Sequence, residues 1–362
     1  MNFDFSDDQR RLQEEIRRVL SEHSSSAHVR QVLNGEQLFS ESAWQQLAQL
    51  GALGMALPEH LGGTGLGALE LCLLAEESGR ALAAVPLLST VYLAAEIIRD
   101  AGSEAQQQKY LPAIASGAVT VCCQLTTQTD SIMPCEPLAL SGHLLSGSVD
   151  ALADAMSATH ALLRVGDALV MTDLSQDGVV RTAQECVDPT RPLGHLQFKD
   201  VPCERVAASG AGIAERAVNG AAVLLAFEQV GGAEAALYAA RDYVLERKTF
   251  GRTVGGYQAV KHNLADLFSA IEIARAHAWY GAWALSSNAP ELPRAAAAAR
   301  VATSEAYNRV AEESLHLHGG IGFTWEMDCH LHLRRARWLA QILGSRHSWR
   351  NRLAATLIEE SV

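Results

Sequence analysis

Hydrophobic residues recur every three to four positions in the first part of the chain, and this spacing predicts helices. Ser6 stands where a helix N-cap is expected, and the apolar side chains after it are spaced for one helix face: Leu12, Ile16, Val19 and Leu20. The expected helices are 4–20, 42–50, 67–83 and 87–101. We therefore expect a helical N-terminal domain over residues 1–115.

The pattern changes near residue 115. Pro134 and Pro137 interrupt the helical spacing, and Gly166-Asp167 is a typical turn pair. Short runs with strand character follow, at 162–165, 168–171 and 179–180. These runs predict a middle β domain, a sandwich or barrel, over residues 116–205.

Helical spacing returns at about residue 211 and continues to the end of the chain. Three further long helices are expected at 257–286, 292–318 and 336–358. Four long helices in succession predict an antiparallel bundle over residues 206–362. The predicted fold class is α+β and mostly α, with the β domain between two helical domains.

Composition narrows the possible functions. The 362 residues are 48% hydrophobic and 19% charged, which is typical of a globular chain, and the net charge of −12 argues against non-specific nucleic-acid binding. We expect no membrane span, because we find no apolar stretch of about 18 residues. The N-terminus lacks the pattern of a signal peptide, and the seven cysteines form no C-x-x-C pair. We expect reduced thiols and a cytoplasmic protein.

One acidic residue stands out in the apolar run 221–233. Glu228 is the ionisable side chain of that run. A carboxylate on a buried helix is costly unless it is paired or has a chemical role. The sequence leaves two interpretations open for Glu228, a structural ion-pair partner or a general base.

Four segments together resemble the acyl-CoA dehydrogenase family over the whole chain. The opening FDFSDDQ resembles the family's first helix, and LPEHLGGTG resembles its P-E-x-x-G-G-x-G loop. RKTFGR with the following YQAVKH resembles the R-x-x-F-G signature, and LHGGIGFT matches the G-G-x-G-[FY] loop. The segments are 3–9, 57–65, 247–262 and 317–324. Each is weak alone, but their order and spacing are specific.

The resemblance implies an FAD enzyme that desaturates an acyl-CoA thioester and passes electrons to an electron-transfer flavoprotein. It also implies an oligomer in which Arg247 and Phe250 contact the FAD of a neighbouring subunit, at its pyrophosphate and adenine end. Gly319 and Gly320 would let the backbone approach that cofactor. The simpler alternatives are a solvated helix-end cation for Arg247 and a helix C-cap for the glycines.

Two further residues are assigned by the resemblance. Thr126 would offer a hydroxyl to the flavin ring, and His316 stands where the family has a glutamine at the adenine side. No metal site is expected, because His316 and His318, like His330 and His332, are two residues apart and point to different helix faces.

The usual family bases are missing. The glutamate of the E-G-T turn is Leu343 here, and the alternative position on the first bundle helix is Ala221. Glu228 lies two helical turns after position 221, in a phrase resembling the A-E-Q-x-G-G-A segment of bacterial enzymes for steroid and other bulky substrates. It is the remaining candidate for the catalytic base.

The flavin side also departs from the family pattern. Residues 127–131 differ from its T-E-P-G-x-G-S-D stretch, and Ala151 and Ala153 replace a tryptophan and a threonine. The leading hypothesis is an FAD-dependent acyl-CoA dehydrogenase for a bulky acyl group. The alternative is a non-catalytic or half-site subunit of a heterotetramer with a paralogous chain. A flavin monooxygenase or nitroalkane oxidase would need an aspartate base, for which we see no aligned residue.

Overall fold

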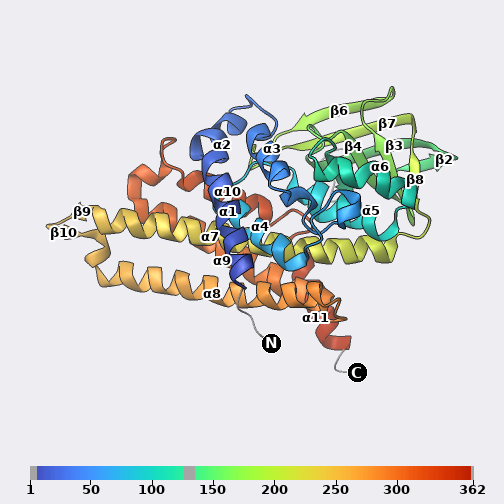
Figure 1. Ribbon diagram of the computed structural model, residues 1–362. Coiled ribbons are helices and arrows are strands. Elements are labelled where there is room, and N and C mark those ends of the chain that lie inside the picture. Colours follow the sequence, from blue (N-terminus) through green and yellow to red (C-terminus); the bar gives the residue numbers. More distant parts are fainter. Residues whose placement is uncertain (1–5, 126–134, 360–362) are drawn as a thin grey trace. The chain divides into compact units, whose positions relative to one another are not determined.

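The computed structural model describes residues 6–125 and 135–359 (Figure 1). It divides into two compact units along the chain. The first unit comprises Met1–Ser26, Ala68–Ala83 and Ala222–Val362, and the second comprises Ala27–Gly67 and Ala84–Ala221. The long helix α7 (Ala211–Glu246) has residues in both units. Mostly helical segments surround the strands in sequence, which confirms the predicted α+β, mostly α fold.

The first unit is helical. Its elements are α1 (Asp7–His23), α4 (Ala68–Arg80), most of α7, the hairpin β9 (Lys248–Thr249) and β10 (Arg252–Thr253), η4 (Val254–Gly256), α8 (Gln258–Ser286), α9 (Leu292–His318), η5 (Gly319–Phe323), α10 (Cys329–Leu339) and α11 (Arg346–Glu359). Ser6 caps α1 as predicted: its hydroxyl accepts from the Gln9 amide at 3.2 Å, and the Gln9 side chain accepts from the Ser6 amide at 3.0 Å.

The prediction of one helix over 336–358 was wrong. The structure has two helices there, and the chain turns between α10 and α11. Leu343 has φ +61° and Gly344 has φ +111°, values that an α-helix cannot accommodate. The predicted helix over 87–101 is confirmed, and its first part, Leu88–Ala95, is a π-helix (η3) that continues into α5 (Glu96–Ala101).

The second unit contains the strands. Its helical elements are α2 (Ser26–Leu33), α3 (Glu41–Gln49), η1 (Ala52–Gly54), η2 (Glu59–Leu61), η3, α5 and α6 (Glu104–Ala115). One sheet has the order β1-β4-β5-β8 and the other has the order β2-β3-β7-β6. The strands are β1 (Val121–Gln124), β2 (Ala139–Ser141), β3 (Leu144–Ala153), β4 (His160–Val165), β5 (Ala168–Asp173), β6 (Val179–Gln184), β7 (Leu193–Pro202) and β8 (Glu204–Ala207).

The two sheets share one hydrophobic core, as in a β-sandwich. Leu163 and Val170 from the first sheet and Val149 and Phe198 from the second belong to one buried cluster. The pairing within the first sheet is antiparallel except for β1 and β4, which are parallel. The strand runs predicted from alternation fall within β4, β5 and β6, which confirms them.

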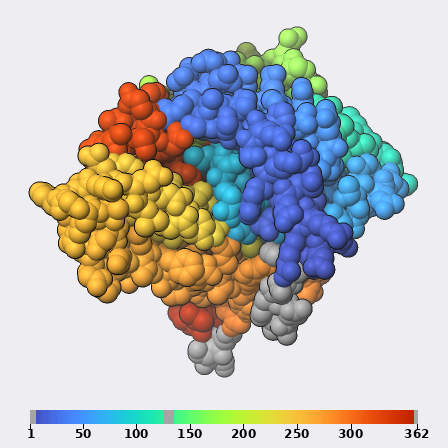
Figure 2. Space-filling view, turned by 60° about the vertical axis from the view of Figure 1, so that its left-hand side comes forward, coloured from blue at the N-terminus to red at the C-terminus, as the bar shows by residue number. Residues whose placement is uncertain are grey.

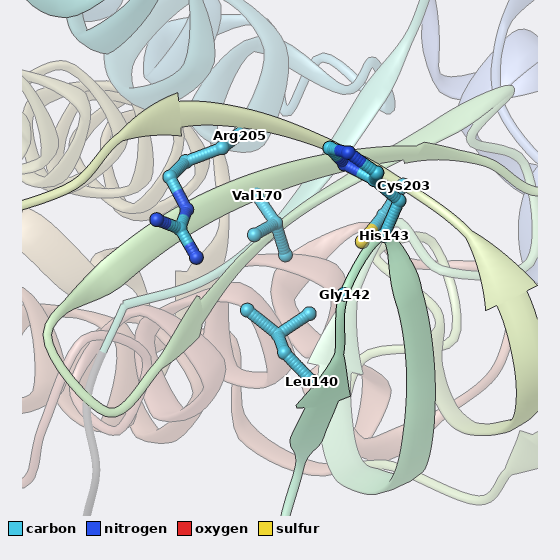
Figure 3. A pocket seen from close by; sticks show the side chains of 6 residues that line it. All are labelled: Leu140, Gly142, His143, Val170, Cys203 and Arg205. Atoms are coloured by element: carbon cyan, nitrogen blue, oxygen red, sulfur yellow. The ribbon is translucent and has the colours of Figure 1, made fainter.

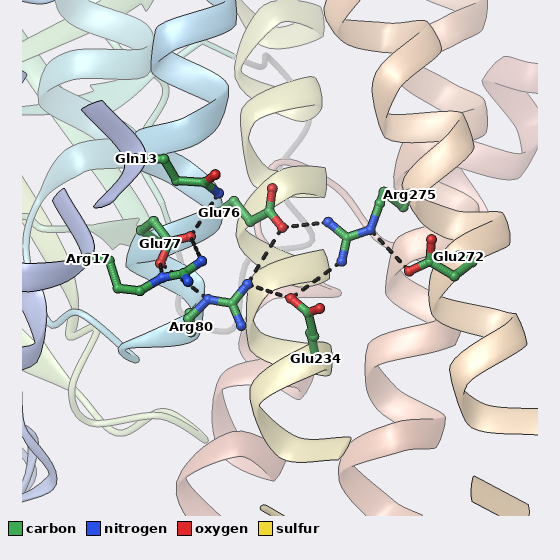
Figure 4. Close-up of polar contacts among 8 residues, drawn as sticks. All are labelled: Gln13, Arg17, Glu76, Glu77, Arg80, Glu234, Glu272 and Arg275. Atoms are coloured by element: carbon green, nitrogen blue, oxygen red, sulfur yellow. Dashed lines mark hydrogen bonds and ion pairs between the residues drawn. The ribbon is translucent and has the colours of Figure 1, made fainter. Parts of the chain in front are cut away.

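Charged side chains are packed between α1, α4, α7 and α8 in the first unit (Figure 4). Glu76 and Glu77 of α4 are almost fully buried. Burial raises the pKa of Glu76, although the adjacent Arg275 opposes the change. The ion pairs are Arg17–Glu77, Arg80–Glu77, Arg80–Glu234, Arg275–Glu76, Arg275–Glu234 and Arg275–Glu272. This network joins helices that are distant in sequence.

Helix α7 has the length and apolar composition of a membrane span, but 89% of its apolar window is buried within the protein. A mostly buried helix of this kind is typical of a protein core. By length and composition alone this helix is weak evidence for a membrane span, and the expectation that the chain has no apolar stretch of this length was wrong.

Candidate functional site

Glu228 lies where α7 crosses α4 at very close range. A Cβ atom added at Gly79 of α4 would lie 1.8 Å from the Glu228 carbonyl oxygen, and one added at Gly231 of α7 would lie 1.9 Å from the Glu76 carbonyl oxygen. Both positions must therefore be glycine for the backbones to approach this closely. The crossing buries the Glu228 residue, which is 1% exposed.

Arg335 of α10 forms an ion pair with Glu228. Its Nη1 atom lies 3.4 Å from Glu228 Oε1, and both side chains are buried. The same guanidinium donates to the Ala83 and Leu82 carbonyl oxygens, each at 3.2 Å, beyond the end of α4. Arg335 thus joins three parts of the first unit: α7, α10 and the segment after α4.

This geometry supports the ion-pair interpretation of Glu228. Arg335 places a buried cation beside the Glu228 carboxylate, and removing one partner of a buried ion pair costs about 3–5 kcal/mol. Carbonyl acceptors from Leu82 and Ala83 would offset part of this cost. The role of Glu228 as a general base stays a prediction.

A second buried arginine, which the sequence analysis missed, lies next to this pair. Arg300 of α9 is 1% exposed and donates to Gln229 Oε1 at 2.7 Å and to the Leu339 carbonyl oxygen at 2.6 Å. It also donates to the Ile342 carbonyl oxygen at 3.1 Å. Burial lowers the pKa of Arg300 to about 10. Its position after an unbroken alanine run in α9 was the available signal.

Arg300 holds the turn that carries Leu343. Its bonds to Leu339 and Ile342 satisfy carbonyl groups at the end of α10, where helix acceptors lack intrahelical donors. The turn that resembles the family's E-G-T segment is therefore well anchored, but its side chain at 343 is aliphatic and cannot accept a proton.

Arg247 and Phe250 lie at the hairpin that connects α7 to α8. Phe250 is 97% exposed and has φ +48°, an unfavourable combination for a large apolar residue. Arg247 is exposed and makes no ion pair with the part of the chain that the structure describes. The β9–β10 hairpin region, in golden yellow, lies at the surface in Figure 2. An exposed aromatic ring beside an unpaired cation is typical of a binding surface.

Gly319 and Gly320 follow α9, and His318 at the end of that helix stacks on Tyr243 near the end of α7. Their ring centroids are 4.5 Å apart. Gly319 has φ +65° and ends α9, so the predicted C-cap turn is present. A Cβ atom at either glycine would meet nothing within 4 Å, which leaves open space beside the backbone.

The other predicted site residues are His316 and Thr126. The His316 side chain is 65% exposed, and its Nδ1 atom lies 3.9 Å from Glu313 Oε1. Thr126 lies outside the described residues. Within 6–125 and 135–359, no group of three His, Cys, Asp or Glu side chains could hold a metal ion.

Some residues of the first unit that the resemblance assigns to FAD suit this cofactor chemically. The uncompensated cation Arg247 suits a pyrophosphate group, and the open backbone at Gly319 and Gly320 can approach a cofactor closely. These residues lie at one end of the helices of the first unit, whereas Glu228 and Arg335 are buried at the α4–α7 crossing. Glu228 thus lies in a different environment from Arg247, Gly319 and Gly320.

Comparisons with known proteins agree with the fold. The family models "Acyl-CoA dehydrogenase, N-terminal domain" and "Acyl-CoA dehydrogenase, C-terminal domain" match residues 6–118 and 208–358. The chain is 33% identical to the acyl-CoA dehydrogenase IpdE2 of Mycobacterium tuberculosis over 349 residues, covering 96% of each chain.

Solved structures are also similar to this chain in fold and sequence. A steroid acyl-CoA dehydrogenase variant, Tcur3481-Tcur3483 G363A, is 30% identical with a TM-score of 0.88 and coverage of 98% of each chain. The ChsE4-ChsE5 complex of Mycobacterium tuberculosis is 26% identical with a TM-score of 0.90 and coverage of 99% of each chain. The chain belongs to the acyl-CoA dehydrogenase family, resembles its bacterial steroid-type branch, and is an oxidoreductase that acts on CH–CH groups.

Proposed function

We propose that this chain is a subunit of an FAD-dependent acyl-CoA dehydrogenase that desaturates a bulky, steroid-like acyl-CoA between its α and β carbons. The similarity to a steroid acyl-CoA dehydrogenase supports the substrate class. FAD, when bound, supplies the acceptor for the β hydride, and an electron-transfer flavoprotein receives the electrons. The α proton goes to a protein carboxylate.

We further propose a role for each residue assigned to the cofactor. Arg247 would pair with the pyrophosphate, Phe250 would pack on the adenine end of a neighbouring subunit's FAD, and Gly319 and Gly320 would give the backbone close access. The exposure of Phe250 and the open space at the glycines support these roles. Two contacts rest on resemblance alone: His316 at the adenine side and Thr126 at the flavin ring.

The observation that carries our proposal for the assembly is the buried Glu228–Arg335 pair. Because Ala221 and Leu343 cannot accept a proton and Glu228 is held by Arg335, we propose that a paralogous partner chain supplies the catalytic base. The likeness to ChsE4-ChsE5, a complex of two differently named chains, supports a heteromeric assembly. This chain would then contribute half-sites to a heterotetramer.

A second candidate is a self-sufficient homo-oligomer with Glu228 as the base. It is favoured by one observation: Glu228 is the acid of the buried stretch 221–233 of α7, two helical turns from position 221. Proton abstraction would then require the carboxylate to separate from Arg335, or to become neutral beside it.

The amount of FAD bound per chain distinguishes these assemblies. The chain is purified alone and after co-expression with its paralogous partner, and each preparation is assayed for FAD and for flavin reduction by a steroid-type acyl-CoA. Our proposal expects little FAD and no flavin reduction by the chain alone, and both in the complex. Full FAD occupancy and flavin reduction by the chain alone would contradict the heteromeric proposal and favour the second candidate.

A further inference from the structure

A cavity of about 280 Å³ opens between the two sheets of the second unit, and none of the roles above uses it. Figure 3 shows Arg205 on one side and His143 with Cys203 on the other, with Val170 and Leu140 between them. Leu140 comes from one sheet and Val170 and Arg205 from the other, so the cavity lies where the sandwich opens. Its size is close to the lower end of ligand pockets, about 300 Å³.

Arg205 gives this cavity a positive charge that no acidic neighbour neutralises. It makes no ion pair within the described ranges 6–125 and 135–359. Its chain neighbour Glu204 points to the opposite face of β8, where it contacts Tyr110 and lies 2.9 Å from Lys109 Nζ. The strand therefore separates the two charges and leaves the guanidinium on the cavity side.

The pKa of the Cys203 thiol shows the effect of this charge inside the cavity. Burial raises the pKa of the Cys203 thiol, and the positive charge of Arg205 opposes that rise, so the field of the guanidinium reaches the sulfur. The Cys203 amide donates to the His143 carbonyl oxygen at 2.8 Å and ties the β2–β3 turn to the opposite wall. This backbone hydrogen bond holds the wall without using the imidazole of His143, which is exposed.

We propose that this cavity binds a small organic carboxylate, with its charged group against Arg205 and its short apolar part on Leu140 and Val170. An arginine with no carboxylate partner is suited to a planar carboxylate, with which it can form two parallel hydrogen bonds. The apolar side chains between Arg205 and His143 favour an amphiphilic anion over a fully hydrated inorganic one.

The first test uses Cys203 as a chemical reporter in the full-length chain. Alkylation by the anionic reagent iodoacetate and by its neutral analogue iodoacetamide is measured at Cys203 by peptide mass spectrometry. Cys186 is the internal control, since it is also partly buried but lies near Asp188. We expect a higher iodoacetate-to-iodoacetamide rate ratio at Cys203 than at Cys186. Arg205→Gln should lower the Cys203 rate ratio about three- to tenfold, and Arg205→Lys should retain it. Lys199 is an exposed cation outside the cavity, so Lys199→Gln should not change the ratio.

The second test measures protection of Cys203 from iodoacetamide by butyrate, by butyramide and by inorganic phosphate, all at one ionic strength. We expect protection by butyrate alone, lost in Arg205→Gln. Equal protection by butyrate and butyramide would show that the charge is not recognised, and equal protection by phosphate would show that the apolar surface is not used. Either result, or no protection at all, would overturn the proposal. These readouts are independent of flavin reduction and of the proposed function.

Discussion

Arg335 Nη1 lies 3.4 Å from Glu228 Oε1, and this contact joins α10 to α7 in the interior of the first unit. The guanidinium is also fixed by the carbonyl oxygens of Leu82 and Ala83. Removing one partner of a buried ion pair leaves the other charge buried without it, whereas replacing both partners by neutral side chains does not. The stability of single and double variants therefore tests whether the pair is structural.

We expect Arg335→Met to lower the free energy of unfolding by about 3–5 kcal/mol, because it removes a buried cation that lies 3.4 Å from the Glu228 carboxylate. The double variant Glu228→Gln/Arg335→Met should be more stable than Arg335→Met alone. Urea denaturation followed by circular dichroism measures both. Equal or lower stability of the double variant would show that the two charges are not coupled.

The glycine contacts between α4 and α7 predict a sharp positional effect. Gly231→Ala should prevent native packing, because its Cβ would lie 1.9 Å from the Glu76 carbonyl oxygen. Gly212→Ala is the matched control in the same helix, since a Cβ there meets nothing within 4 Å, and it should be neutral or stabilise by up to about 1 kcal/mol. Thermal unfolding of both variants checks the prediction, and similar melting temperatures would contradict it.

His332 predicts a pH dependence of stability. Its Nδ1 lies 3.0 Å from the Tyr307 hydroxyl, and burial lowers its pKa from 6.5 to about 4. Since the unfolded chain takes up this proton first, the contribution of His332 to stability is complete above pH 6.5 and is lost as the pH falls towards 4.

The corresponding variant is His332→Gln, which keeps a polar group near Tyr307. Between pH 6.5 and 4, the parent should lose roughly 2 kcal/mol more of its unfolding free energy than the variant does. Urea denaturation at a series of pH values measures the difference. Parallel pH profiles of parent and variant would mean that His332 does not carry this dependence.

Phe250 predicts an effect on assembly. Phe250→Ala should weaken FAD binding and the association of subunits, because a 97% exposed ring at a left-handed position is suited to a partner surface. Val180→Ala, at a 55% exposed apolar residue of the second unit, is the control and should change neither. Analytical ultracentrifugation with flavin absorbance gives both quantities. A Phe250→Ala protein with unchanged assembly and FAD content would rule out the cross-subunit role.

The sequence predicted those parts of the fold that depend on local pattern. Ser6 identified the N-cap of α1, and alternation identified β4 and β5. The resemblance placed a turn at Leu343, but the apolar spacing predicted one helix across it, since the break depends on φ angles of two residues. The spacing of apolar residues does not show such a local change in backbone conformation.

The candidate site was predictable in its residues but not in its contacts. Glu228 was visible as the acid in an apolar run, yet Arg335 lies 107 positions away and only the packing of α10 against α7 brings them together. Arg300 was not identified for the same reason, because its acceptors, the Gln229 side chain and two main-chain carbonyl groups, are distant in sequence and give no sequence signature.

The most direct test of our central claim is the rate of flavin reduction in the reconstituted complex when both charges of the Glu228–Arg335 pair are removed. If a partner chain supplies the base, Glu228→Gln/Arg335→Met with bound FAD should be reduced by a steroid-type acyl-CoA at close to the parent rate. A loss of about a hundredfold or more, with FAD still bound and the fold intact, would identify Glu228 as the base and contradict our account.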